Sequence, residues 1–97
     1  MSVSFDQKLA VTQDTLINVI EGESVLLNLK SESYFGLDQI GTRMWSLLTT
    51  SDSIQAAYES LLDEYDVDAD KLRQDMQDLI EKLIANGLVE VVSEKAA

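Results

Sequence analysis

The hydrophobic pattern of this chain changes its period once, at Asp38. Before that point, runs rich in β-branched and other large apolar residues cover residues 16–20 and 25–29, with the tripeptide Glu-Gly-Glu between them. Two such runs around a short turn containing glycine predict a β-hairpin. A polar turn and an aromatic run at residues 34–37 follow, so we expect a third strand and a three-stranded antiparallel meander.

After Asp38, apolar residues recur at helical spacing in three segments. Asp38 and Asp68 carry the carboxylate that suits an N-terminal cap, and the Asn-Gly pair at 86–87 tolerates the backbone that closes a helix. We therefore expect helices after Asp38, at about residues 53–65 and after Asp68, with a short strand or extended tail at residues 88–92. The apolar stripes of these helices are Ile40, Met44, Leu47 and Leu48; Ile54, Ala57, Tyr58, Leu61 and Leu62; and Leu72, Met76, Leu79, Ile80, Leu83 and Ile84.

These elements predict an α+β fold of winged-helix-like form, in which a three-stranded antiparallel sheet is followed by three helices. With 97 residues, the chain has room for one modest core. We divide it into a partly ordered arm at residues 1–14, a domain at residues 15–92 and a frayed tail at residues 93–97. A sheet of three strands leaves at least one edge unpaired unless another segment covers it. The apolar side chains of the arm, which should pack on the domain, are Phe5, Leu9 and Val11.

The net charge of −11 arises from eighteen acidic and seven basic side chains, and it restricts the possible partners. Such a surface repels the phosphates of nucleic acids and anionic lipids, and it favours basic or neutral partners. The apolar runs are too short for a membrane span or for the core of a signal peptide. We therefore expect a cytoplasmic protein with no nucleic-acid partner and no membrane partner.

Histidine and cysteine are both absent. Their absence excludes a thiol nucleophile, an imidazole base, a disulfide framework and any metal site built from these residues. Most acidic residues fall at predicted helix starts or on the predicted solvent side of helices, where a solvated face is the usual role. We therefore expect no enzyme activity, no metal and no cofactor.

Two short segments imitate ligand-binding loops. Residues 66–70 have the alternating aspartates of a calcium loop, but Lys71 stands where such a loop requires glycine, and we interpret the segment as an acidic helix start. Residues 36–43 contain two glycines between a strand and a helix, but the Lys and Ser/Thr of a phosphate-binding loop do not follow the second one. We interpret Gly36 as a tight bend or a close backbone approach.

Residues 25–48 read VLLNLKSESYFGLDQIGTRMWSLL, and this segment resembles the PqqD-like family, whose members are also called RiPP recognition elements. The family pattern is an Asn-containing Leu/Val strand, a polar turn, and Tyr-(Phe/Tyr/Trp)-x-Leu-(Asn/Asp)-x-x-Gly-x-x-(hydrophobic)-Trp-x-x-Leu. The likeness extends over residues 15–92. The residues that match the second part of the pattern are Tyr34, Phe35, Leu37, Asp38, Gly41, Met44, Trp45 and Leu48.

The resemblance implies a function. Members of this family bind the leader segment of a ribosomally synthesised precursor peptide and present the core segment to tailoring enzymes such as a leader peptidase. The leader adds as an antiparallel strand to the third strand, in the groove between that strand and the third helix, which is β-augmentation. The chain resembles stand-alone proteins of lasso-peptide pathways more than those of pyrroloquinoline quinone synthesis, and this role requires no cofactor.

The resemblance also implies the peptide-binding residues. Met76 is the preferred groove residue because a flexible methionine suits an adaptable peptide site, but a core stripe has the same period as a groove wall. One of Tyr34 and Phe35 should face the core and the other the opposite side, because side chains alternate along a strand. Trp45 and Leu48 favour the core. The implied site consists of Ser33, Tyr34, Phe35 and Gly36 on the edge strand and Leu72, Asp75, Met76 and Leu79 on the third helix.

Two other functions are compatible with the predicted fold. A winged helix can place a helix in the major groove of DNA, but acidic residues outnumber basic ones on the third helix, which disfavours contacts with phosphates. An acidic adaptor would use a similar groove to bind a folded protein instead of a leader segment. Through its free sheet edge, the protein would be a monomer or a weak dimer.

Overall fold

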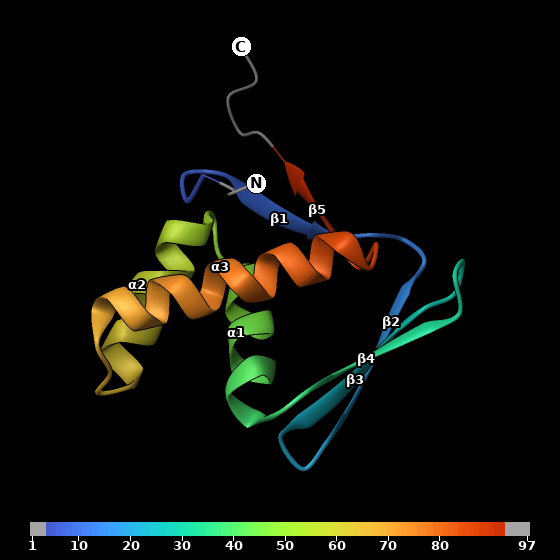
Figure 1. The fold of residues 1–97 in the computed structure, drawn as a ribbon, viewed down its shortest axis with the longest axis horizontal. Helices are drawn as coiled ribbons and strands as arrows, with labels where there is room; N and C mark the ends of the chain where they lie inside the picture. Colours follow the sequence, from blue (N-terminus) through green and yellow to red (C-terminus); the bar gives the residue numbers. More distant parts are fainter. Residues whose placement is uncertain (1–3, 93–97) are drawn as a thin grey trace.

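The computed structural model describes residues 4–92, so the predicted frayed tail at residues 93–97 lies outside the described residues. It confirms the α+β fold, with three helices and a three-stranded antiparallel sheet. Figure 1 shows the three-stranded sheet extending away from the helices. The elements, in chain order, are β1 (Lys8–Val11), β2 (Thr15–Ile20), β3 (Glu23–Asn28), β4 (Ser33–Leu37), α1 (Gln39–Thr50), α2 (Ile54–Glu64), α3 (Ala69–Ala85) and β5 (Val89–Val92).

The predicted hairpin is formed by β2 and β3, and β4 extends it into a sheet of order β2-β3-β4. Its turn consists of Glu21 and Gly22, whose φ angles are 52° and 84°. Two consecutive residues with positive φ are the requirement of the tight turn that matches the twist of a hairpin, and glycine meets it without steric cost. The register pairs Leu26 with Ile17 on one side and with Phe35 on the other.

A second sheet, which we did not predict from the sequence, is formed by β1 and β5 in antiparallel register. β1 has four residues and one fully buried side chain, Leu9, so it offers no periodic pattern to detect. Its partner strand lies at the other end of the chain. Phe5 is also buried, with its ring edge-on to Tyr58 and the guanidinium of Arg73 4.1 Å from its ring centre. Val11, in contrast, is exposed rather than packed on the domain.

Each helix begins at a side-chain cap. The Asp38 carboxylate accepts from the Gly41 N–H at 2.8 Å, and the Asp68 carboxylate accepts from the Lys71 N–H at 3.2 Å, as predicted. The Ser53 hydroxyl caps α2. Such caps satisfy backbone donors that have no partner inside the helix. Gly87, with φ of 70°, follows the end of α3.

The core lies between the three helices, the β1–β5 sheet and the inner face of β3 and β4. Trp45 and Leu48 are buried in it, as expected. β2 contributes no buried residue, so the hairpin packs on the core through β3, while the Thr15 hydroxyl at the start of β2 donates to the Leu88 carbonyl at 3.1 Å. One anchor is the hydrogen bond of 2.7 Å between the hydroxyls of Ser24 on β3 and Thr42 on α1. None of the helices within residues 4–92 combines the length and the apolar character needed to cross a membrane.

Candidate functional site

β4 is an edge strand. One of its edges pairs with β3, and no strand within residues 4–92 pairs with the other. Figure 1 shows α3 running past this second edge, on the side of the sheet where the helices lie. The backbone N–H and C=O groups along this edge are therefore available to another extended chain.

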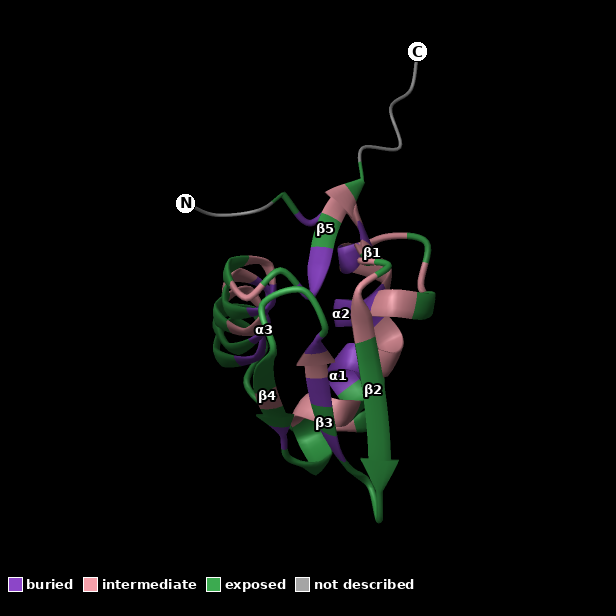
Figure 2. Ribbon diagram, turned by 90° about the vertical axis from the view of Figure 1, so that its right-hand side faces the viewer, coloured by how far each residue is buried: buried purple, intermediate pink, exposed green. Residues whose placement is uncertain are grey.

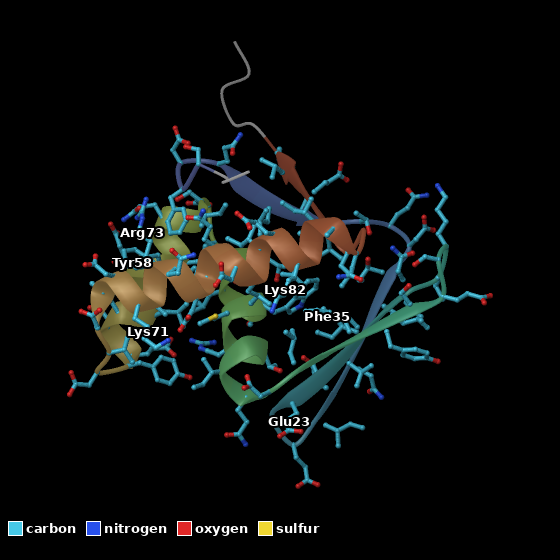
Figure 3. All side chains as sticks on the ribbon, viewed as in Figure 1. Glu23, Phe35, Tyr58, Lys71, Arg73 and Lys82 are labelled. Atoms are coloured by element: carbon cyan, nitrogen blue, oxygen red, sulfur yellow. The ribbon has the colours of Figure 1, made fainter. Side chains whose placement is uncertain are left out.

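The register decides how the side chains of β4 alternate. Phe35 pairs with Leu26, which is fully buried, so Phe35 belongs to the inner face and packs partly against the core. Figure 3 shows Phe35 beneath α3, close to Lys82. Tyr34 points to the outer face and is 73% exposed. The sequence left this choice open, and the structure assigns Phe35 to the core side.

A groove of about 470 Å³ lies between β4, the start of α1 and α3. Its apolar lining comes from all three elements, with Phe35 on β4, Ile40 and Met44 on α1, and Leu79 on α3. Its charged lining comprises three acidic side chains and one basic one, namely Asp38, Asp75, Asp78 and Lys82. An apolar floor beside a free strand edge can accept an extended peptide, and the acidic residues give this groove a negative potential.

A smaller apolar pocket of about 130 Å³ adjoins the groove, and Ile40, Met44 and Asp75 line both. It lies between α1, the end of α2 and the first turns of α3, and Leu72 contributes to its wall. At its rim, the Lys71 ammonium and the Asp75 carboxylate form an ion pair at 3.5 Å. The pocket has the size and the chemistry to take one apolar side chain.

The helical residues of the implied site separate into two groups. Asp75 and Leu79 line the groove, and Leu72 lines the smaller pocket. Met76 is 0% exposed and lines neither cavity, so it packs in the core rather than forming the groove wall. Its neighbours on the buried stripe of α3 are Leu72, Ile80 and Leu83. On the strand, Phe35 and Gly36 line the groove, whereas Ser33 and Tyr34 line neither cavity.

Sequence reasoning missed Ile40, Met44 and Lys82 as groove residues. Ile40 was assigned to the inner face of α1, but it is 51% exposed and overhangs the groove. The signal that could have revealed it is its position in the first turn of a helix that begins directly after the edge strand. A side chain at that position lies beside any chain that extends the sheet.

An ion pair on the surface joins α1 to the end of α2. The Arg43 guanidinium donates from Nε to the Glu64 carboxylate at 2.9 Å. This hydrogen bond lowers the pKa of Glu64 and raises the pKa of Arg43, while desolvation opposes both shifts. Neither side chain lines the groove, so the pair concerns helix packing rather than the site.

Comparison with known proteins agrees with the resemblance that residues 25–48 indicated. Residues 23–89 match the family described as coenzyme PQQ synthesis protein D (PqqD), so the chain belongs to the PqqD family. Among solved structures, it is similar to TbiB1 in complex with the TbiA(beta) leader peptide. The two are 32% identical, with a TM-score of 0.78 over 84% of this chain and 94% of that one. A comparison of the sequence with curated proteins found no match.

Proposed function

We propose that this protein binds the leader segment of a ribosomally synthesised precursor peptide and presents the core segment to a tailoring enzyme. The observation that carries the proposal is the free edge of β4 beside an apolar groove, in a chain similar to a protein solved with its leader peptide. The leader would add to β4 as an antiparallel strand. The backbone groups of Ser33 to Leu37 would supply hydrogen bonds that tolerate many sequences.

Selectivity would come from the side chains of the groove. Alternate leader side chains would point inward, toward Phe35 and Leu79, and the others would point outward, beside Tyr34. Because the added strand is antiparallel, its N-terminal end would lie near Leu37 and Ile40. An apolar leader residue that precedes the paired segment would reach the smaller pocket. Binding of this kind requires no catalytic group or cofactor from this chain.

The direction of the strand also fixes where the core segment leaves. The C-terminal end of the paired leader would lie at Ser33, beside the turn between β3 and β4. The core segment would therefore leave the protein at that end and reach the enzyme, such as a leader peptidase, from there. We further propose a lasso-peptide type of pathway, which a gene for a short precursor encoded beside a peptidase gene would support.

A titration of backbone amides by NMR tests the proposal. The probe is a synthetic leader from the nearest encoded precursor, and a scrambled peptide of the same composition is the control. We expect shifts at residues 33–37 and 75–82, and slower hydrogen exchange along β4 where new hydrogen bonds form. If the scrambled peptide gives the same shifts, or if no shifts occur at β4, leader recognition fails and the acidic adaptor becomes the leading function.

A further inference from the structure

The outer face of the three-stranded sheet is apolar and uncovered. Within residues 4–92, α1 and α2 lie behind the sheet when it is viewed as in Figure 2, α3 lies to its left beside β4, and β2 is exposed over most of its length. Leu16 on β2 pairs with Leu27 on β3, which pairs with Tyr34 on β4, so the three side chains form one row across this face. We call the face formed by this row and its neighbours the outer face, and its exposed large apolar side chains are Leu16, Ile20, Val25 and Tyr34.

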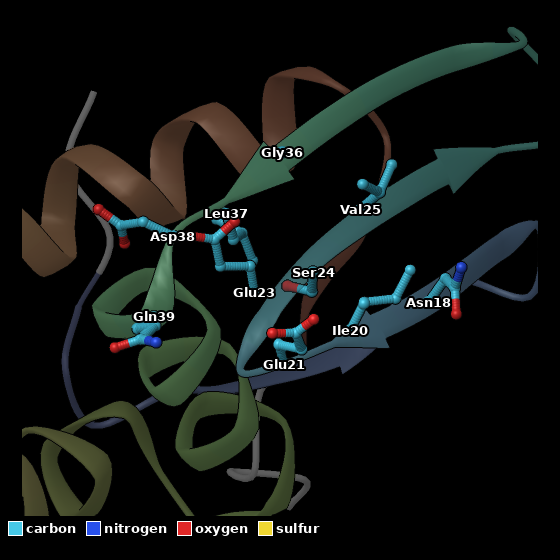
Figure 4. A pocket seen from close by; sticks show the side chains of 10 residues that line it. All are labelled: Asn18, Ile20, Glu21, Glu23, Ser24, Val25, Gly36, Leu37, Asp38 and Gln39. Atoms are coloured by element: carbon cyan, nitrogen blue, oxygen red, sulfur yellow. The ribbon is translucent and has the colours of Figure 1, made fainter.

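The outer face contains a hollow. Asn18, Val25 and Gly36 form the next row, and a Cβ atom at Gly36 would meet nothing within 4 Å. Gly36 is therefore neither a tight bend nor a close approach, as the sequence suggested, but a position where a side chain is missing from the surface. The hollow has a volume of about 720 Å³, and Figure 4 shows it bordered by Ile20. It can receive side chains from a second surface.

The charges around this face select the kind of partner. From Asp14 to Asp38 the sequence has five acidic residues and one basic residue, Lys30. Glu21 and Glu23 border the hollow itself. A second copy of this chain would bring the same acidic border against itself, with a net charge of −11 on each molecule. The complementary surface is therefore apolar and bordered by Lys or Arg.

We propose that the outer face docks a folded protein with such a basic-bordered apolar surface, and that this protein is the enzyme that acts on the bound peptide. The proposal rests on the proposed function, because a leader paired with β4 would extend the sheet and place alternate side chains beside Tyr34. The enzyme would then contact the sheet and the leader on one continuous surface. Bound leader should therefore strengthen docking.

The test uses the purified peptide-processing enzyme encoded next to this protein, and it measures binding with and without the synthetic leader. Ile20→Asp and Val19→Asp form a matched pair, because the two residues are neighbours on β2 with 61% and 53% exposure but point to opposite faces. We expect Ile20→Asp to weaken docking about tenfold or more, which is about 1.4 kcal/mol, and Val19→Asp to leave it within about twofold. Both variants should bind the leader as the wild type does.

Charge gives an independent arm of the test. The double variant Glu21→Gln/Glu23→Gln should weaken docking at low salt and reduce its dependence on salt, because the exposed charges are screened less at low ionic strength. Equal docking by both β2 variants would overturn the proposal, as would a wild-type dimer in solution that Ile20→Asp dissolves. If the leader itself does not bind, the proposed function fails, which is a separate result from loss of docking with leader binding intact.

Discussion

The two edges of the three-stranded sheet present the same backbone groups but different surroundings. β4 lies beside α3 and α1, so a strand added there would find Phe35 on one side and Leu79 on the other. β2 has no facing element within residues 4–92, and all its residues after Thr15 are exposed. Both edges can form hydrogen bonds with an added strand. Only at β4 would that strand also contact a second wall, which α3 and α1 form. We infer that selectivity for a peptide resides in the helices rather than in the strand.

β2 also lacks the residues that usually protect an edge. Its six residues include no charge and no proline, whereas lysine, proline or a bulge commonly blunts an exposed edge. The acidic residues that flank the hairpin are the remaining protection against unwanted pairing. We therefore propose that β4 and β2 differ in what each binds, namely an extended peptide at β4 and a folded surface over β2.

The largest expected effect tests whether the second wall depends on the packing of α3. Met76 is fully buried on the inner stripe of α3, so Met76→Ala should lower the free energy of unfolding by about 2–5 kcal/mol. Urea denaturation measures this loss. Leu79→Ala is the matched control, because Leu79 is only partly buried on the same helix and should cost less. Met76 would belong to the binding surface instead if its replacement weakened leader binding with little loss of stability.

The next effect concerns the side-chain hydrogen bonds of Asn28, which we call the Asn28 clamp. The Asn28 side chain donates to the carbonyls of Asn86 and Gly87 at 3.0 and 3.1 Å, and its oxygen accepts from the N–H of Lys30 at 2.9 Å. It therefore ties the start of the β3–β4 turn to the end of α3. Asn28→Ala leaves these groups unpaired and should cost about 1–3 kcal/mol of stability.

Leader binding separates a local clamp from a general loss of stability. With the end of α3 released from the sheet, Asn28→Ala should weaken leader binding even at temperatures where the variant is fully folded. Ser24→Ala is the matched control, since it removes the buried hydrogen bond to Thr42 from the same face of β3. Equal leader affinity for the wild type and Asn28→Ala would show that the groove keeps its width without the clamp.

A smaller effect compares the two edges directly, by placing an aspartate near each of them. Ile40 in the groove and Ile20 on the outer face are 51% and 61% exposed, so either change to aspartate should leave the fold stable. An acidic residue in the first turn of α1 also suits the helix dipole. Ile40→Asp should weaken leader binding about tenfold, or about 1.4 kcal/mol, whereas Ile20→Asp should leave it unchanged. Isothermal titration calorimetry measures both, and loss of binding in Ile20→Asp alone would move the site to β2.

Local patterns predicted much of this structure. The caps at Asp38 and Asp68 and the strand at β4 depend on residues close in sequence, so the sequence suffices to find them. β1 could not be found, because its four residues are ordered by β5 at the far end of the chain. The sequence predicted only some of the residues that line the groove. Leu79 and Met76 belong to one apolar stripe, and only the positions of β4 and α1 decide that Leu79 borders the groove while Met76 is covered.

The smallest expected effect lies away from both edges, at the pair of Arg43 and Glu64. The hydrogen bond from Arg43 lowers the pKa of Glu64 in the folded protein, so its stabilising contribution is present above the pKa of Glu64 in the unfolded chain. The contribution is lost as the pH falls through the lowered pKa. Glu64→Gln should therefore melt slightly below the wild type at neutral pH, and the difference should vanish in acid.

The pair also serves as a control for the comparison of the edges. Both side chains are exposed, so salt should reduce the difference between the wild type and Glu64→Gln. Leader affinity should be the same in both proteins, because neither residue lines the groove. A change in leader affinity would mean that the packing of α1 against α2 sets the position of Ile40 and Met44. The second wall would then be a movable element, and the selectivity of β4 would depend on helix packing as well as on the side chains that face the peptide.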